Sequence, residues 1–243
     1  MQDLLKPIKT DSLKDVFISR FEELILSGKL QIGERLPSER ELALQLGVSR
    51  PVVHEGLLDL STKGLVTMIP RRGTVINDYR KEGSLSLLTT LFNYHRGRLD
   101  PKLLGSVLQM RFLLEVEASK LSALNRNEGH LEQFSTIIET EQRLDRGDVE
   151  AWTQIDFEFH HLVTMSTGNI LFPLLFNSFK QFYTNLSGKF FSSPSARLEI
   201  PMFHQNLFLA IEKKDADESM NIMKKMLLHG EENLRRIVQK QGF

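Results

Sequence analysis

Helix start and stop signals crowded between residues 38 and 51 constrain this fold more than any other feature. Ser38 followed by Glu41 matches a capping box, in which each side chain satisfies a backbone N–H group at the start of a helix. Gly47 permits the left-handed residue that ends a helix, and Ser49 with Pro51 then opens another. Helical spacing predicts the buried faces, formed by Leu42, Ala43 and Leu46 in the first helix and by Val53, Leu57 and Leu60 in the second. Two short helices joined by a glycine turn indicate a helix-turn-helix.

The segments on either side extend this unit. Before it, one helix is predicted from apolar residues at helical spacing, namely Leu13, Phe17, Phe21, Leu24 and Ile25, with a stop at Ser27-Gly28. After Gly64 the apolar residues alternate, which predicts a β-hairpin with Arg71 and Arg72 at its tip. We therefore expect a mainly α protein whose residues 1–77 form a winged helix-turn-helix domain of three helices plus a β-hairpin.

The start of the third helix carries the side chains best placed to read DNA. The first turns of a recognition helix meet base edges in the major groove, and the end of the preceding helix meets phosphates. Ser49, Arg50 and His54 occupy these turns, and Arg50 is expected to make a bidentate contact with guanine. Arg40, at the start of the second helix, reaches a phosphate or a base, or alternatively pairs with Glu39.

Charge composition limits how DNA can be held. The 243 residues contain 31 basic and 31 acidic side chains, so the formal net charge is zero. Attraction to phosphates must then come from a few well-placed cations. The hairpin tip, with Arg71 and Arg72 and no acidic residue, is expected to meet the minor groove or backbone; the alternative is that both arginines are merely solvated.

The same segment resembles the winged helix-turn-helix of GntR-family transcription regulators. The matching stretches run from Gly33 to Ala43, Leu46 to Arg50, Gly64 to Val66 and Arg72 to Thr74. The family usually has arginine where this chain has His54, which implies a weaker and pH-dependent contact there. Combined with helix geometry, the resemblance gives the expected DNA-binding set: Ser38, Arg40, Ser49, Arg50, Pro51, His54, Arg71, Arg72 and Gly73.

From residue 84 onward the sequence predicts only helices. We expect a linker at 78–83 and an all-helical bundle of six or seven helices at 84–243, which binds an effector and dimerises. The longest stretch without Lys, Arg, Asp or Glu runs from Phe159 to Phe179 and contains Gly168 and Pro173. It is interpreted as a helix pair with a turn, not a membrane span. The absence of cysteine and of an apolar leader in the first twenty residues is typical of a cytoplasmic protein.

One group of residues in this bundle has metal-binding chemistry. Asp156 and His160 share a helix face, and His204 is predicted to lie opposite Met226, with His229 three residues further on. A carboxylate with two or three imidazoles suits a divalent transition metal that keeps an open position. The alternatives are a helix ion pair between Asp156 and His160 and a simple buried histidine at 204.

A second resemblance concerns this bundle. The runs from Asp156 to His160 and from Ser166 to Asn169, together with His204, resemble the FCD effector domain of the FadR subfamily. This implies a zinc, nickel or manganese ion on Asp156, His160 and His204, with Met226 where a fourth ligand is expected unless His229 replaces it. Residues 182–197 are instead similar to the fatty-acid-responsive FadR branch, which binds acyl-coenzyme A without this metal set.

These observations predict a transcription regulator rather than an enzyme. Arg111, Asn169 and Tyr183 are the candidate effector-binding residues, and Arg111 either neutralises a ligand carboxylate or phosphate or pairs with Glu115. A small organic acid is the expected effector and acyl-coenzyme A the alternative. A homodimer on a palindromic operator is expected, because one recognition helix reads only a few base pairs. A metal-dependent hydrolase with an accessory winged-helix domain is the remaining alternative.

Overall fold

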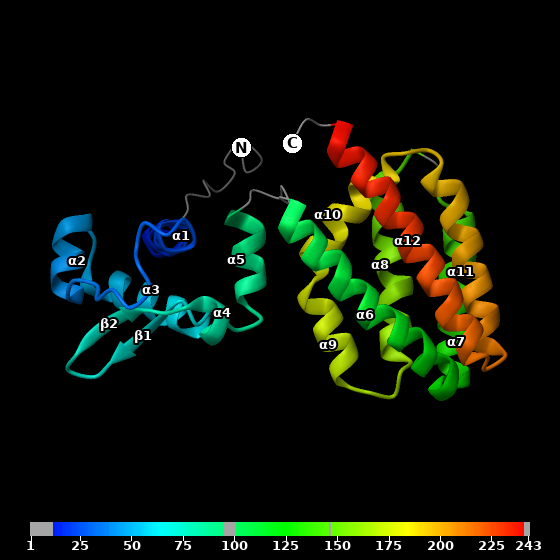
Figure 1. Ribbon diagram of the computed structural model, residues 1–243, viewed down its shortest axis with the longest axis horizontal. Coiled ribbons are helices and arrows are strands. Elements are labelled where there is room, and N and C mark those ends of the chain that lie inside the picture. Colours follow the sequence, from blue (N-terminus) through cyan, green and yellow to red (C-terminus); the bar gives the residue numbers. More distant parts are fainter. Residues whose placement is uncertain (1–11, 95–100, 146, 241–243) are drawn as a thin grey trace, which may run out of the picture. The chain divides into compact units, whose positions relative to one another are not determined.

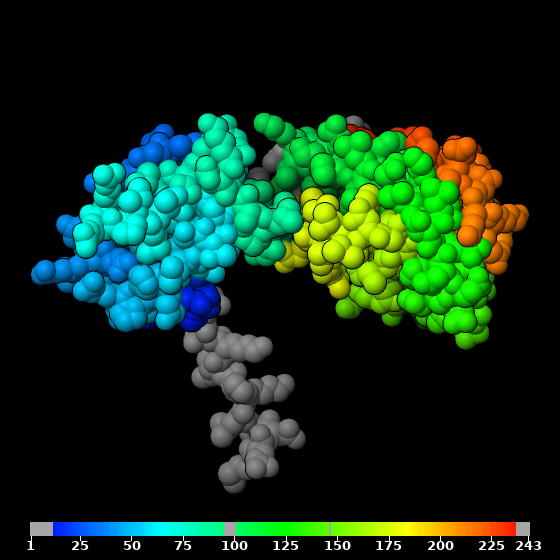
Figure 2. Space-filling model, turned by 90° about the horizontal axis from the view of Figure 1, so that it is seen from below, coloured from blue at the N-terminus to red at the C-terminus, as the bar shows by residue number. Residues whose placement is uncertain are grey.

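The computed structural model describes residues 12–94, 101–145 and 147–240, which fall into two units on either side of residues 95–100 (Figure 1). The first unit contains α1 (Leu13–Leu26), α2 (Glu39–Leu46), α3 (Arg50–Thr62), β1 (Val66–Ile69), β2 (Gly73–Ile76), α4 (Tyr79–Glu82) and α5 (Leu87–Tyr94). The second contains α6 (Pro101–Asn125), α7 (Glu128–Gln142), α8 (Val149–Met165), α9 (Leu171–Ser178), α10 (Lys180–Phe191), α11 (Ala196–Glu212) and α12 (Ala216–Lys240). Each unit is closely packed in Figure 2, the first coloured blue to turquoise and the second green to red. The predicted fold class is confirmed.

The predicted start and stop signals of α2 are present in atomic detail. Ser38 Oγ accepts a hydrogen bond from Glu41 N at 3.3 Å, and the Glu41 carboxylate accepts one from Ser38 N at 2.8 Å. The Ser38 hydroxyl also donates to the Glu41 carboxylate at 2.8 Å, and this hydrogen bond together with the one from Ser38 N lowers the pKa of Glu41. Gly47 ends the helix in the left-handed region, with φ 66°. Ser49 precedes α3 as its N-cap, but its hydroxyl makes no capping hydrogen bond.

A third extended segment, which the sequence analysis did not predict, pairs with the β-hairpin of the wing. β1 and β2 pair antiparallel, with Val66 opposite Ile76 and Ile69 opposite Gly73. Residues 33–36, which precede α2, also pair with β2. Gly33 N donates to Ile76 O, Ile76 N to Glu34 O and Leu36 N to Thr74 O, each at 2.9 Å. The wing is thereby attached to the residues that lead into α2.

The first unit extends beyond the boundary expected at residue 77. Part of the expected linker at 78–83 forms α4, where the Asp78 side chain caps the helix by accepting a hydrogen bond from Arg80 N. Leu87 of α5 is buried in the same core as Leu57 and Leu65. Thr90 Oγ1 also donates to Glu22 Oε1 of α1 at 2.7 Å. The apolar face of α5 thus packs within the first unit, which therefore runs through α5.

In the second unit, α8 packs against α6, α7, α9 and α10, while α12 packs against α6 and α11. The stretch from Phe159 to Phe179 comprises the end of α8, a turn at left-handed Gly168 and α9, as predicted. Phe179 separates α9 from α10. No helix within the described ranges is long and apolar enough to cross a membrane.

Replacing Gly64 should destabilise the first unit through two separate effects. Gly64 has φ +77°, and a Cβ there would lie 1.9 Å from the Glu82 carbonyl oxygen. We expect Gly64→Ala to lower the free energy of unfolding by about 2 to 5 kcal/mol, combining left-handed strain with steric overlap. Gly47→Ala is the control, because Gly47 has φ +66° and nothing within 4 Å of its added Cβ. Equal losses in the two variants, measured by urea unfolding, would contradict the steric effect.

Candidate functional site

Three segments of the first unit bring arginines into one surface groove. The start of α2 contributes Arg40, the start of α3 contributes Arg50, and the hairpin tip contributes Arg71. All three side chains are exposed. The rest of the groove is lined by Pro37, Ser38, Glu39, Met68, Ile69, Pro70, Gly73 and Thr74. Residues up to 37 positions apart in the sequence thus share a single concave surface of positive character.

The ion pair considered for Arg40 does not form. Glu39 Oε1 lies 2.8 Å from His54 Nδ1, so this carboxylate joins α2 to α3. Within the part of the chain that is described, Arg40 makes no ion pair. Its guanidinium is available to a phosphate or a base, and His54 has one ring nitrogen engaged by protein.

The turn at the wing tip leaves Arg71 and Arg72 exposed to solvent. Arg71 has φ 62° and Gly73 has φ 92°, so the turn holds a non-glycine residue in the left-handed region. Arg71 and Arg72 are exposed and, among the described residues, lack ion-pair partners, although only Arg71 lines the groove. Ser49 and Pro51 are exposed at the start of α3.

Arg35 is a cation near the wing that the sequence analysis missed. Its side chain passes Gly73, where an added Cβ would lie 3.9 Å from the Arg35 Cδ. Arg35 also forms a bridge with Val75. The extended conformation favoured before Pro37 was a signal for this pairing.

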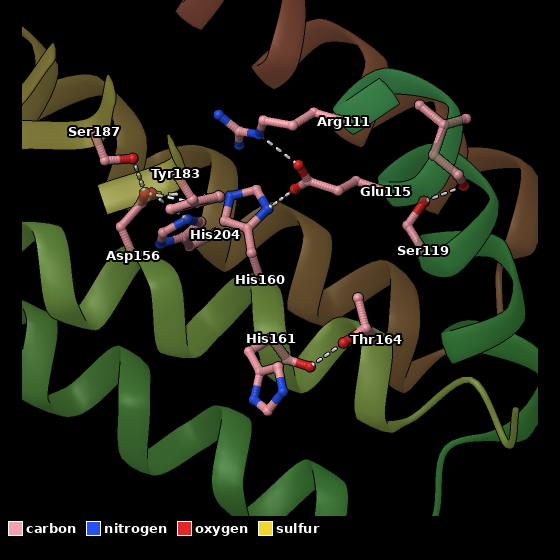
Figure 3. Close-up of polar contacts among 11 residues, drawn as sticks. Arg111, Glu115, Ser119, Asp156, His160, His161, Thr164, Tyr183, Ser187 and His204 are labelled. Carbon is pink, nitrogen blue, oxygen red and sulfur yellow. Dashed lines mark hydrogen bonds and ion pairs between the residues drawn. The ribbon is translucent and has the colours of Figure 1, made fainter. Parts of the chain in front are cut away.

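The second unit contains a buried polar cluster, drawn in Figure 3. Arg111 and Glu115 lie one turn apart on α6, and Asp156 and His160 lie one turn apart on α8. Tyr183 and Ser187 come from α10, His204 from α11 and Glu141 from α7. The helices that supply the cluster thus come from separate parts of the chain, and the cluster joins them.

Asp156 lies between the two histidines. Its Oδ1 is 3.8 Å from His160 Nε2 and 3.6 Å from His204 Nε2, separations too long for hydrogen bonds. Its Oδ2 accepts hydrogen bonds from Tyr183 Oη at 2.7 Å and Ser187 Oγ at 2.9 Å. The three groups can each offer one ligand atom within 4.8 Å of the others, and all three are buried. The described residues therefore include the predicted arrangement of Asp156, His160 and His204.

Two further carboxylates contact the Nδ1 atoms of the two histidines, on the side of each ring away from Asp156. Glu115 pairs with both Arg111 Nε, at 2.6 Å, and His160 Nδ1. Glu141 Oε1 lies 2.9 Å from His204 Nδ1. His204 Nε2 is buried without a hydrogen bond and faces Asp156. Both Nε2 atoms are consequently directed toward one carboxylate.

These contacts shift the pKa values of several groups. Burial alone would raise the pKa of Glu115, but Arg111 and His160 outweigh it and lower the pKa to about 2. Burial would lower the pKa of His204, yet Glu141 and Asp156 raise it overall. Burial and the Asp156 charge raise the pKa of Tyr183 well above its usual value, so Tyr183 remains a proton donor.

A cavity opens beside the cluster. Its polar lining includes Arg111, Asp156, His160 and Ser187. Its apolar walls come from Leu108, Phe112, Phe190, Ile200, Met226, Leu227 and Leu234. Arg111 makes the ion pair with Glu115 and stacks 4.2 Å from the centre of the Tyr183 ring while lining this cavity. Arg111 therefore forms the ion pair that was one of the two alternatives and also borders the cavity.

Two expected site residues lie elsewhere. His229 Nε2 is 2.9 Å from Glu199 Oε2 and is not part of the described three-ligand group, because its side chain faces α11. Met226, three residues earlier, lines the cavity instead. Asn169 Oδ1 accepts from Leu171 N at 2.9 Å at the start of α9, and the residue borders a separate hollow with His161 and Ile170.

The sequence analysis did not identify Glu141 as part of the cluster. Glu141 lies on α7, 15 residues before Asp156 and on a different helix, so no helical spacing connects the two. Glu115 was identified only as a partner for Arg111. Its contact with His160 depends on how α6 packs against α8.

A winged helix-turn-helix with an arginine-lined groove, followed by a helical domain with a cavity, is the architecture of a class of DNA-binding transcription regulators. Residues 16–76 match the family of bacterial regulatory proteins, gntR family, and residues 77–239 match the FadR C-terminal domain. The chain belongs to the GntR family and carries a FadR-type C-terminal domain. It is thus a transcription regulator and not an enzyme, as the sequence predicted.

Similar proteins agree with this assignment. The chain is 31% identical over 208 residues to the HTH-type transcriptional regulator Mce2R of Mycobacterium tuberculosis, covering 85% of each chain. It is 29% identical over 194 residues to the fatty acid metabolism regulator protein of Shewanella pealeana, covering 79% of each. A solved structure described as "Lar controls the expression of the Listeria monocytogenes agr system and mediates virulence" has a TM-score of 0.59 at 18% identity, covering 94% of this chain and 99% of that one. This last likeness supports the fold.

Acid should weaken the second unit through Glu115. The folded protein lowers the pKa of Glu115 from the ordinary 4.5 to about 2, so its contribution is fully present above 4.5 and is lost as the pH falls toward 2. We expect the free energy of unfolding of metal-free protein, measured by urea titration, to fall across this interval. Glu115→Gln should fall less steeply, whereas Glu117→Gln, at an exposed carboxylate on the same helix, should follow the wild type. Parallel curves for wild type and Glu115→Gln would contradict the assignment.

Proposed function

We propose that this chain is a homodimeric, sequence-specific regulator that binds a palindromic operator and responds to a small carboxylic acid in its C-terminal domain. The observation that carries the proposal is the meeting of Arg40, Arg50 and Arg71 in one groove. A chain with zero net charge needs such local concentration to hold DNA. Two-fold symmetry supplies the second recognition helix that a unique operator requires.

Asp156, His160 and His204 fit a divalent metal. Two ligands about 2.1 Å from one ion lie roughly 3 to 4 Å apart. The separations of 3.6 and 3.8 Å from Asp156 Oδ1 agree with that expectation. Glu115 and Glu141 hold the opposite ring nitrogens, as outer carboxylates do in histidine metal sites. Zinc, nickel or manganese bound here would supply a Lewis acid for a ligand carboxylate.

The effector proposal follows from the cavity lining. Arg111 offers a guanidinium at the polar end, and the other walls are apolar apart from Glu231, which pairs with Arg235. That combination suits a molecule with one anionic head and an apolar body. The similarity to fatty acid metabolism regulators favours acyl-coenzyme A as the alternative. Native mass spectrometry of the purified protein distinguishes the two by the mass of what remains bound.

The DNA interface is tested by two arginine variants on an operator obtained by selection from random duplexes. Arg50→Ala should cost about 1 to 3 kcal/mol of binding and relax the preference at one position. Arg71→Ala, which we expect to remove a phosphate contact, should weaken all sequences alike and reduce the salt slope by about one unit. Fluorescence anisotropy at several salt concentrations measures both. Unchanged affinity in Arg50→Ala would show that α3 is not the recognition helix.

The metal proposal is tested by content and affinity for zinc. His160→Ala should abolish binding, whereas His161→Ala should retain it, because His161 points away from the cluster (Figure 3). The His161 ring instead stacks with the rings of Phe157 and Phe176. Met226→His should tighten binding by adding the ligand that methionine does not supply. Chelator competition measures the affinities. Equal zinc content in the His160 and His161 variants would place any metal elsewhere.

A further inference from the structure

Glu39 is unusual among the residues that line the arginine groove. It is the one acidic residue in that lining, within the described part of the chain, and a carboxylate facing DNA repels phosphates. Its partner is not one of the arginines but His54, whose Nδ1 lies 2.8 Å from Glu39 Oε1. The pair therefore joins the first turn of α2 to the recognition helix at the groove.

His54 is placed to reach a base edge. It lies one helical turn after Arg50, and its side chain is 51% exposed. Arg50 is exposed as well, and positions 50 and 54 lie about 40° apart around the helix axis. His54 and Arg50 thus share the outward face of the helix that the proposed function places in the major groove.

The contact with Glu39 determines which hydrogen bonds the ring can offer. An ionised carboxylate only accepts hydrogen bonds, so Nδ1 must carry the proton that is shared with Glu39. In the neutral ring Nε2 is then an acceptor. The base atoms that donate in the major groove are adenine N6 and cytosine N4, whereas guanine and thymine present acceptors there.

We infer that Glu39 and His54 act together as a specificity element: Glu39 fixes the ring of His54, and His54 Nε2 accepts a hydrogen bond from the amino group of an operator adenine or cytosine next to the base read by Arg50. Glu39 is a positioning residue in this arrangement, and His54 makes the contact. The inference rests on the proposed DNA groove.

The test compares operator preferences rather than affinity alone. Duplexes are selected from a random pool by wild type, His54→Ala, Glu39→Ala and Glu39→Gln, and are then measured by fluorescence anisotropy at one salt concentration. The wild type should prefer adenine or cytosine at one position by roughly 3- to 10-fold, the worth of one hydrogen bond. This preference should disappear in His54→Ala and in Glu39→Ala. It should persist in Glu39→Gln, because the glutamine side-chain oxygen still accepts from Nδ1.

Glu55→Ala is the control for Glu39→Ala, because Glu55 is an exposed carboxylate next to His54 on α3 and its removal changes the net charge equally. It should alter affinity without altering the preference. Preference for guanine or thymine at the position, or an unchanged selection profile in His54→Ala, would overturn the inference. If the wild type selects no operator at all, the groove itself is wrong; if Arg50→Ala changes the profile and His54→Ala does not, only the pair's role is wrong.

Discussion

Three carboxylates buried in one helical domain impose the strongest physical constraint on this molecule. Removing a carboxylate from water costs several kcal/mol unless charge and hydrogen bonds compensate. Glu115 is compensated by Arg111 and His160, Glu141 by His204, and Asp156 by the hydroxyl groups of Tyr183 and Ser187. Because these partners come from α6, α7, α8, α10 and α11, the helices that form the second unit must keep their relative register to keep the charges satisfied.

Local sequence patterns predicted the DNA-binding half well because its signals act over a few residues. The capping box depends only on Ser38 and Glu41, and the helix end depends only on the conformation of Gly47. Both are present as predicted. The pairing of residues 33–36 with β2, by contrast, joins segments some 40 positions apart, so no short pattern announced it. The prediction that residues from 84 onward belong to the C-terminal bundle was wrong for α5 for a similar reason. An apolar helix face does not show which of the two units it packs against.

The residues of the buried cluster likewise fall into those that local patterns identified and those that only packing brings together. Asp156 and His160 were identified together because one helical turn separates them, and His204 joined them through its predicted position opposite Met226 and the resemblance to the FCD domain. The predicted role of His229 required a shift by part of a turn, but its contact with Glu199 holds it on another side of α12. Glu141 offered no pattern, because its relation to His204 exists only once α7 and α11 pack.

The packing of α5 determines where this protein can be divided. Leu87 belongs to the core built by α1 and α3, and Thr90 is bonded to Glu22. A fragment ending at residue 77 would expose apolar surface that Leu87 and Leu91 normally cover and would leave Glu22 without one of its hydrogen-bond partners. An isolated DNA-binding domain with an intact interior therefore has to retain the chain through Tyr94, which makes α5 an integral part of the DNA-reading domain and not a tether.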